Sequence, residues 1–126
     1  MSQPVERSNR TVLTREEGYR FRVRFDEAAM PDLLTDEMPP IGEGKGPTPS
    51  RLLATAVANC LAASLLYCLQ IARVSVEGLE AEVTTEFTRN DAGRLRIWDM
   101  RVKLYPKWTA EHSAVVFKIR HYREIA

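Results

Sequence analysis

Residues 19–25 alternate strictly between large apolar and positively charged side chains. A period of two places alternate side chains on opposite faces of a β-strand. We therefore predict a half-buried strand here, paired in a hairpin with the segment around Val12 and Leu13 through a turn at residues 15–18. The apolar positions are Tyr19, Phe21, Val23 and Phe25, and the charged ones are Arg20, Arg22 and Arg24.

A long uncharged run dominates the middle of the chain. From Leu52 to Ala72, 21 consecutive residues carry no charge. Thr48 can cap a helix and Pro49 suits its first position, so the sequence predicts one long helix that ends near Arg73. Residues 31–37 before it indicate a short strand, and the Pro- and Gly-rich residues 38–49 indicate a loop.

A helix of that length is long enough to cross a bilayer, at about 1.5 Å of rise per residue. Polar residues are nevertheless scattered around it, and amphipathic strands on both sides of it in the sequence need an apolar partner. We therefore predict a buried core helix and no membrane span. A helix that is apolar on every side is unusual in one chain of this size, so a second copy is expected to cover part of it. The scattered polar residues are Thr55, Asn59, Ser64 and Gln70.

A second hairpin follows at residues 77–106, with its turn at residues 90–93. The apolar phase of its return arm slips by one position at Trp98 and Asp99. Because such a slip reverses the strand face, we predict a β-bulge there. The last segment, from about Thr109, is predicted to be a helix. Hairpins imply antiparallel pairing, so the expected fold class is α+β, in one domain over residues 1–126.

Composition excludes several classes of protein. The chain has 126 residues, 44% hydrophobic residues and a net charge of +1, which fits a globular domain with a real core and gives no basic footprint for nucleic acid. The first ten residues contain no apolar stretch of a signal peptide, so a cytoplasmic location is expected. His112 and His121 form no pattern with a third ligand, and we expect neither metal nor cofactor.

Two further sequence features, a glycine-rich loop and a group of acidic residues, do not indicate a ligand site. Residues 42–48 are similar to a phosphate loop but lack its full pattern. The acidic residues before them fit no metal loop and are expected to be solvated; they are Asp26, Glu27, Asp32, Asp36 and Glu37.

The two cysteines, Cys60 and Cys68, both lie in the predicted helix. Eight residues of helix rise about 12 Å, which is too far for a disulfide within one helix. Free cysteines often act as small buried apolar residues. A reactive thiolate near neutral pH needs an adjacent cation, so Cys60 stays open between these two roles.

Residues 44–65 (GKGPTPSRLLATAVANCLAASL) resemble the OsmC/Ohr family, the osmotically inducible protein C and organic hydroperoxide resistance proteins. The hairpin sequence at 74–97 is similar to that family as well, and the resemblance covers about residues 19–105, with the C-terminal part short or divergent. It implies an intertwined α+β homodimer whose central helices pack together, with active sites at the subunit interface.

The resemblance also implies a chemistry. In the peroxidase branch the helix cysteine attacks an organic hydroperoxide in a largely apolar site and becomes a sulfenic acid. A second cysteine closes a disulfide, which lipoyl-type dithiols reduce. A loop arginine and a glutamate in the first helical turn support the thiolate.

Of these residues, only the attacking cysteine carries over directly, to Cys60. Ser50 stands where the glutamate is expected, and Pro40 stands near the place of the loop arginine. No cysteine follows Cys68, so no resolving cysteine is present. An external thiol would have to complete the cycle.

Three other cations are candidates to support Cys60: Arg22 and Arg24 of the first hairpin, and Arg51 in the first helical turn. Two hypotheses therefore remain open. The first is a thiol-dependent redox enzyme that reduces organic hydroperoxides through Cys60 with an external thiol or dithiol. The second is a non-catalytic OsmC-like module that binds an apolar, lipid-like small molecule or acts as a structural partner.

Overall fold

The computed structural model describes residues 3–107 and 115–120. They form two compact units, Met1–Arg51 and Leu52–Ala126, and each unit is described by itself. The elements are β1 (Thr11–Glu17), β2 (Arg20–Phe25), β3 (Leu33–Thr35), α1 (Pro49–Ile71), β4 (Gly78–Arg89), β5 (Leu95–Lys107) and β6 (Val115–Arg120). The α+β class is thereby confirmed.

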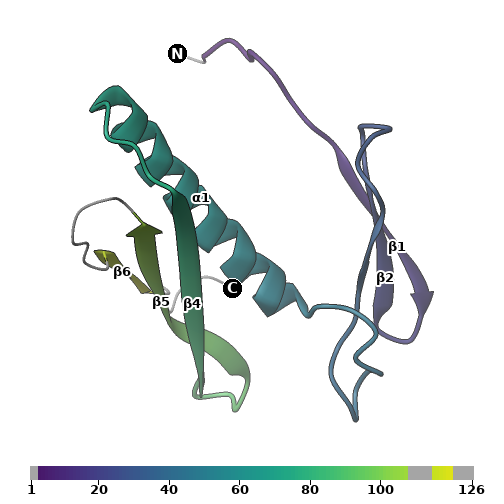
Figure 1. Ribbon diagram of the computed structural model, residues 1–126. Coiled ribbons are helices and arrows are strands. Elements are labelled where there is room, and N and C mark those ends of the chain that lie inside the picture. Colours follow the sequence, from purple (N-terminus) through teal and green to yellow (C-terminus); the bar gives the residue numbers. More distant parts are fainter. Residues whose placement is uncertain (1–2, 108–114, 121–126) are drawn as a thin grey trace. The chain divides into compact units, whose positions relative to one another are not determined.

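The first unit is an antiparallel sheet in the order β1-β2-β3, and Figure 1 shows its β1–β2 hairpin. The predicted hairpin and the short third strand are both confirmed. Its turn lies later than predicted, at Gly18 and Tyr19, because Glu17 pairs with Arg20. Gly18 has a φ of 54°, a left-handed conformation that glycine adopts without steric cost, and this fixes the turn. Val23 is the buried member of the alternating strand.

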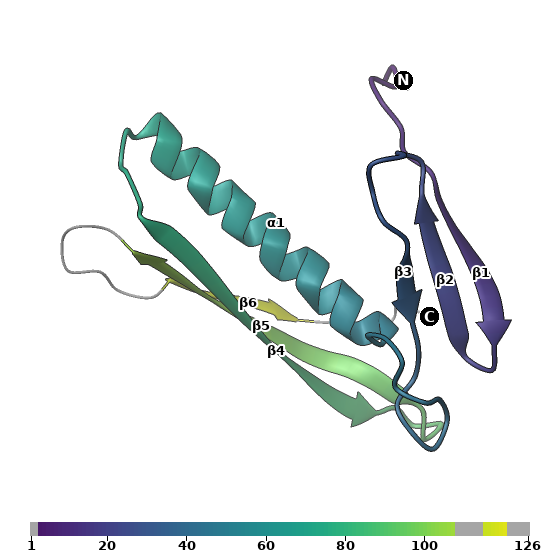
Figure 2. The ribbon, with the colours of Figure 1, turned by 45° about the vertical axis from the view of Figure 1, so that its right-hand side comes forward.

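The second unit contains α1 and an antiparallel sheet in the order β4-β5-β6. Figure 2 shows α1 lying along one face of this sheet, with β4 and β5 forming a long twisted hairpin. The core lies between the helix and the central strand, where Ala58 of α1 meets Val102 and Leu104 of β5. Both β5 side chains are fully buried. The partly buried residues packed around them are Val57, Leu61, Ala62, Leu65, Leu79 and Val83.

The predicted bulge is present in the β4–β5 ladder. Glu86 pairs with Asp99, whereas the next residue, Phe87, pairs with Ile97. Trp98 is therefore the extra residue, and after the bulge Met100, Val102 and Leu104 all lie on the buried face.

Both ends of α1 lie close to their predicted places. At the start, the backbone N–H of Arg51 donates to the Thr48 Oγ1 at 3.3 Å, so Thr48 is the N-cap. At the end, the Val74 N–H donates to the Leu69 carbonyl and the Arg73 N–H donates to the Gln70 carbonyl. These two bonds form a Schellman motif around Arg73, whose φ is 58°.

The predicted C-terminal helix is wrong for residues 115–120, which form β6. β6 pairs antiparallel with β5, from Asp99 opposite Arg120 to Leu104 opposite Val115. The segment is rich in β-branched residues and satisfies backbone groups along an edge that β5 would otherwise leave unpaired. Thr109, His112 and His121 lie outside the described residues.

Leu104→Ala should lower the free energy of unfolding by about 2–5 kcal/mol, since it removes a fully buried side chain and leaves a cavity against α1. Leu95→Ala on the same strand is the matched control. Leu95 is exposed, so its truncation should change stability by less than about 0.5 kcal/mol. Urea unfolding of both variants measures the difference, and equal losses would contradict the core placement.

Candidate functional site

Helix α1 is covered on one face only. Ala54 and Ala58, one turn apart, are its buried residues, and they face the core of the second unit. The opposite face contains no charge and is exposed along the whole helix. Positions on one helical face recur every three to four residues, and this set is Leu53, Ala56, Cys60, Ser64, Tyr67 and Ile71.

This uncharged face differs from an ordinary solvent-facing helix surface, which carries charged and polar residues. Leu53, Tyr67 and Ile71 are 48%, 63% and 66% exposed. By length and composition alone, α1 is the one helix among the described residues that could cross a membrane. Its opposite face already packs on β5, so we interpret α1 as a core helix whose second face is not covered by the other elements of the second unit.

Cys60 lies near the middle of that uncharged face. Its thiol is exposed, and so is the thiol of Cys68 two turns further along. Neither cysteine is therefore a buried apolar side chain within the second unit. A thiol at Cys60 is available to a small molecule or to a partner that approaches this face.

Arg22 and Arg24 belong to the first unit and are engaged by acidic neighbours. The Arg22 Nε lies 2.6 Å from a Glu16 carboxylate oxygen, and Asp32 lies 3.5 Å from Arg22 and 3.6 Å from Arg24. The hydrogen bond and the charge of Glu16 raise the pKa of Arg22 further above its ordinary value. These pairs are partly exposed, so each stabilises the fold only weakly. They nevertheless neutralise much of the positive charge of Arg22 and Arg24, the charge that was expected to stabilise a Cys60 thiolate.

Arg51, the third candidate cation, lies in the first turn of α1. Its guanidinium is 3.5 Å from the hydroxyl of Thr48, which also caps the helix. Nine residues separate it from Cys60, or about 13 Å of helical rise with half a turn of rotation. Arg51 therefore does not support Cys60 of its own chain.

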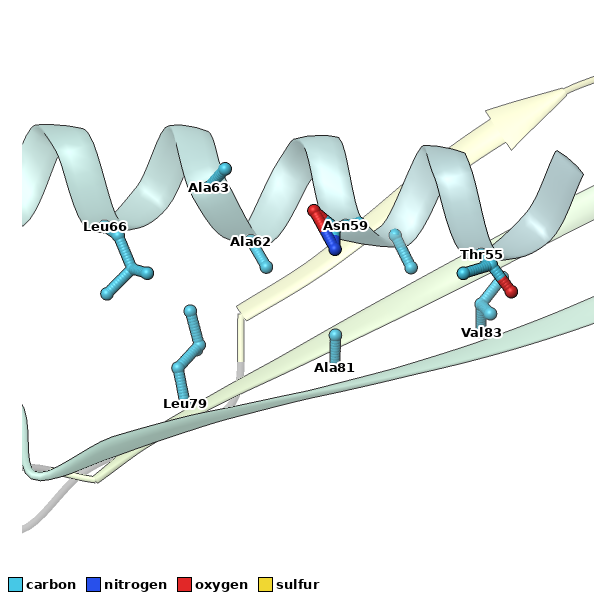
Figure 3. Close-up of a pocket in the computed structure, with 9 residues that line it drawn as sticks. Thr55, Asn59, Ala62, Ala63, Leu66, Leu79, Ala81 and Val83 are labelled. Carbon is cyan, nitrogen blue, oxygen red and sulfur yellow. The ribbon is translucent and has the colours of Figure 1, made fainter. Parts of the chain in front are cut away.

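A groove runs beside α1 in the second unit, between the helix and β4 (Figure 3). Its volume is about 450 Å³, and its walls are mostly alanine and leucine side chains. Asn59 supplies a polar group to it, and Cys60 is not among its residues. The lining consists of Thr55, Ala58, Asn59, Ala62, Ala63, Leu66, Leu79, Ala81 and Val83.

Asp36, expected to be a solvated acid, is instead buried, with 3% of its surface exposed. Its carboxylate accepts the backbone N–H groups of Glu37, Glu43 and Lys45 at 2.8, 3.2 and 3.1 Å. The donors in the glycine-rich loop (residues 36–48) that suggested a phosphate loop therefore bind the protein's own carboxylate.

Burial alone would raise the pKa of Asp36. The three N–H donors and the positive charge of Arg20 outweigh that effect, so the pKa lies below its ordinary value. The signal that sequence reasoning missed was an acidic residue directly before a loop with three closely spaced glycines.

Two of those glycines are required by close approach. A Cβ at Gly42 would overlap the Glu37 carbonyl and the Asp36 carboxylate, and a Cβ at Gly46 would overlap the backbone of Leu34. No group of three or more potential metal ligands is present in the part of the chain that the structure describes.

Comparison with known proteins gives one family and one fold. The family described as OsmC-like protein matches residues 42–119, more than half of the chain, and no curated protein matches it. A crystal structure from Psychrobacter arcticus 273-4 is similar, with a TM-score of 0.68 and 20% identity over 80% of this chain and 72% of that one. That protein is assigned provisionally to osmotic stress induction and detoxification response; at this identity the likeness shows the fold.

Gly46→Ala should destabilise the first unit by about 1–3 kcal/mol or more, because the new methyl group overlaps backbone atoms that cannot move aside. Gly78→Ala is the control. A Cβ there meets only the end of the Lys107 side chain at 3.9 Å, and the cost should stay below about 0.5 kcal/mol. Thermal unfolding compares them, and a harmless Gly46→Ala would contradict the close approach.

Proposed function

Because the chain belongs to the OsmC-like protein family, we propose that it is a thiol-dependent redox protein that reduces organic hydroperoxides through Cys60. The observation that supports this proposal is the position of Cys60, exposed in the middle of an uncharged helix face. An apolar surround suits a lipid-like peroxide, and an exposed thiol is open to attack it.

The proposed cycle needs only one cysteine. The Cys60 thiolate attacks one oxygen of the hydroperoxide, the O–O bond breaks, and the alcohol leaves with a proton. Cys60 is oxidised to a sulfenic acid. A thiol of an external reductant then attacks the sulfur and water leaves, and a second thiol releases Cys60 as its thiol. The reductant ends as a disulfide, which balances the two electrons that the peroxide accepted.

A second copy of the chain is part of the proposal. The uncharged face of α1 needs apolar cover, and a homodimer would provide it while placing cations of one copy near Cys60 of the other. The candidates remain Arg22, Arg24 and Arg51. Glu16 pairs with Arg22 and Asp32 pairs with Arg24. For either arginine to support Cys60, its ion pair would have to loosen, or a second copy would have to bring its own arginine to Cys60.

The cellular role proposed for the protein is detoxification of peroxides in the cytoplasm, as part of a stress response. The family membership supports this role, as does the provisional assignment of the Psychrobacter arcticus structure to osmotic stress and detoxification.

The alternative function is a non-catalytic module that binds an apolar small molecule or acts as an interaction protein. The groove between α1 and β4 favours it, because the groove is apolar apart from Thr55 and Asn59 and does not include Cys60. The engagement of Arg22 and Arg24 by carboxylates also favours it, because a thiolate without a cation is not stabilised near neutral pH.

Consumption of cumene hydroperoxide with excess dithiol, followed in the wild-type chain, Cys60→Ser and Cys68→Ser, separates the two functions. The proposal predicts turnover by the wild type, a loss of at least about 100-fold in Cys60→Ser because the nucleophile is removed, and near-normal turnover in Cys68→Ser. Cys68 is the matched control, as the other exposed cysteine of the same helix.

No turnover by the folded wild-type protein, together with slow alkylation of Cys60 at mildly acid pH, would reject the peroxidase and leave the binding module. Equal losses in both serine variants would instead show that the effect comes from the helix and not from the chemistry of Cys60.

A further inference from the structure

We propose that the ionised carboxylate of Asp36 is a clasp that holds the glycine-rich loop and the start of α1 in place, and that its loss or protonation opens this segment locally. The Asp36 clasp means the carboxylate with the backbone N–H groups of Glu37, Glu43 and Lys45. The proposal concerns the first unit alone and does not depend on the function proposed for Cys60.

The clasp joins positions that are far apart along the loop. Asp36 follows directly after β3, whereas Glu43 and Lys45 lie seven and nine residues later and donate to the same carboxylate oxygen, Oδ2. The backbone of Asp36 adds a further tie, since its N–H donates to the Pro47 carbonyl at 3.2 Å. One residue at the end of a strand thus fixes both the middle and the end of the loop.

The end of the loop leads directly into the helix. Pro47 is followed by the N-cap Thr48, which is itself buried and receives the Arg51 N–H. Gly46 lies against the backbone of Leu34 at a distance that admits no side chain. The place where α1 begins is therefore set by contacts with residues 34–36, and an open clasp would release the first turn of α1.

The donors make an ionised carboxylate necessary. Glu43 and Lys45 donate to Oδ2 and Glu37 donates to Oδ1. A carboxylate accepts strongly at both oxygens, whereas an amide has one oxygen and a protonated acid has a hydroxyl group in place of the second. These hydrogen bonds are part-buried, and bonds to a charged acceptor are among the stronger ones, so removal of the charge should open the loop and let water take its place at these groups. Gly42 and Gly44 close the loop through further backbone bonds to Met38 and Glu37.

The surroundings of Asp36 are mixed in charge. Arg20 of β2 favours the ionised form, while Glu17, Tyr19 and Glu43 line the same cavity of about 250 Å³.

The pKa of Asp36 is lowered on folding, so the stability that its ionised carboxylate contributes depends on pH. This contribution is fully present above the ordinary pKa of 3.8 and is lost as the pH falls through the lower, folded-state value. The clasp is therefore closed at neutral pH and opens only in strong acid.

Hydrogen exchange of the full-length chain at neutral pH tests the proposal, comparing the wild type with Asp36→Asn. The amides of Glu43 and Lys45 should exchange at least about tenfold faster in the variant, as expected for the loss of hydrogen bonds to a charged acceptor. Amides of the β4–β5 ladder in the second unit should keep their protection, which shows in the same sample that the variant is folded.

Glu43→Gln is the matched control, because it makes the same change of charge in the same loop and keeps the Glu43 backbone N–H. It should leave the protection of residues 43 and 45 unchanged. The proposal is overturned if Asp36→Asn exchanges like the wild type, if Glu43→Gln has the same effect, or if the β4–β5 amides lose protection equally, since the opening would then not be local.

Rescue by a small carboxylate gives a second, independent test. Asp36→Ala leaves the N–H donors facing the space of the missing carboxylate, which formate can occupy. Added sodium formate should restore protection at Glu43 and Lys45 at least about fivefold, by renewing a hydrogen bond to a charged acceptor, whereas sodium chloride at equal ionic strength should not. Equal effects of both salts, or no effect of formate, would contradict a carboxylate-specific clasp.

Discussion

The structure depends on a single constraint, the absence of charge along 21 consecutive residues, Leu52–Ala72, which form α1 beyond its first turn and the residue that follows it. One face of the helix satisfies this constraint within its own unit by packing Ala58 against Val102 and Leu104 of β5. The opposite face is uncharged as well, yet nothing in its own unit covers it. Burial of apolar area from water is the main favourable term in folding and association, so cover of this second face would add stability that the second unit alone lacks.

The candidate chemistry follows from the same helix. Cys60 lies on the uncovered face, so its thiol becomes enclosed only when that face is covered. The candidate cations are engaged by other groups: Glu16 and Asp32 pair with Arg22 and Arg24, and Arg51 lies beside Thr48 at the helix start. Under the proposed function, cover and activation of Cys60 would therefore be coupled, because the second copy proposed there would bring its own side chains to this face.

Sequence reasoning predicted the parts of the fold that a strong period determines. The alternation at residues 19–25, the uncharged helix and the phase slip at Trp98 each appear in the structure as β2, α1 and a bulge. It was wrong for β6. A short apolar segment is compatible with either a helix or a strand, and pairing with the free edge of β5 favours the strand. It also missed the Asp36 clasp, because burial of one acidic residue depends on backbone donors seven and nine residues away. Neither the pattern nor the composition reports such contacts.

Sedimentation equilibrium of the wild-type chain at low micromolar concentration tests the central claim most directly. If the uncharged face of α1 is covered by a second copy, the protein sediments at twice the chain mass of 14.4 kDa, and Tyr67→Asp, which places a charge on that face, shifts it toward the single-chain mass. A wild-type protein that stays folded at 14.4 kDa, with the face of Leu53, Tyr67 and Ile71 open to water, would contradict the account.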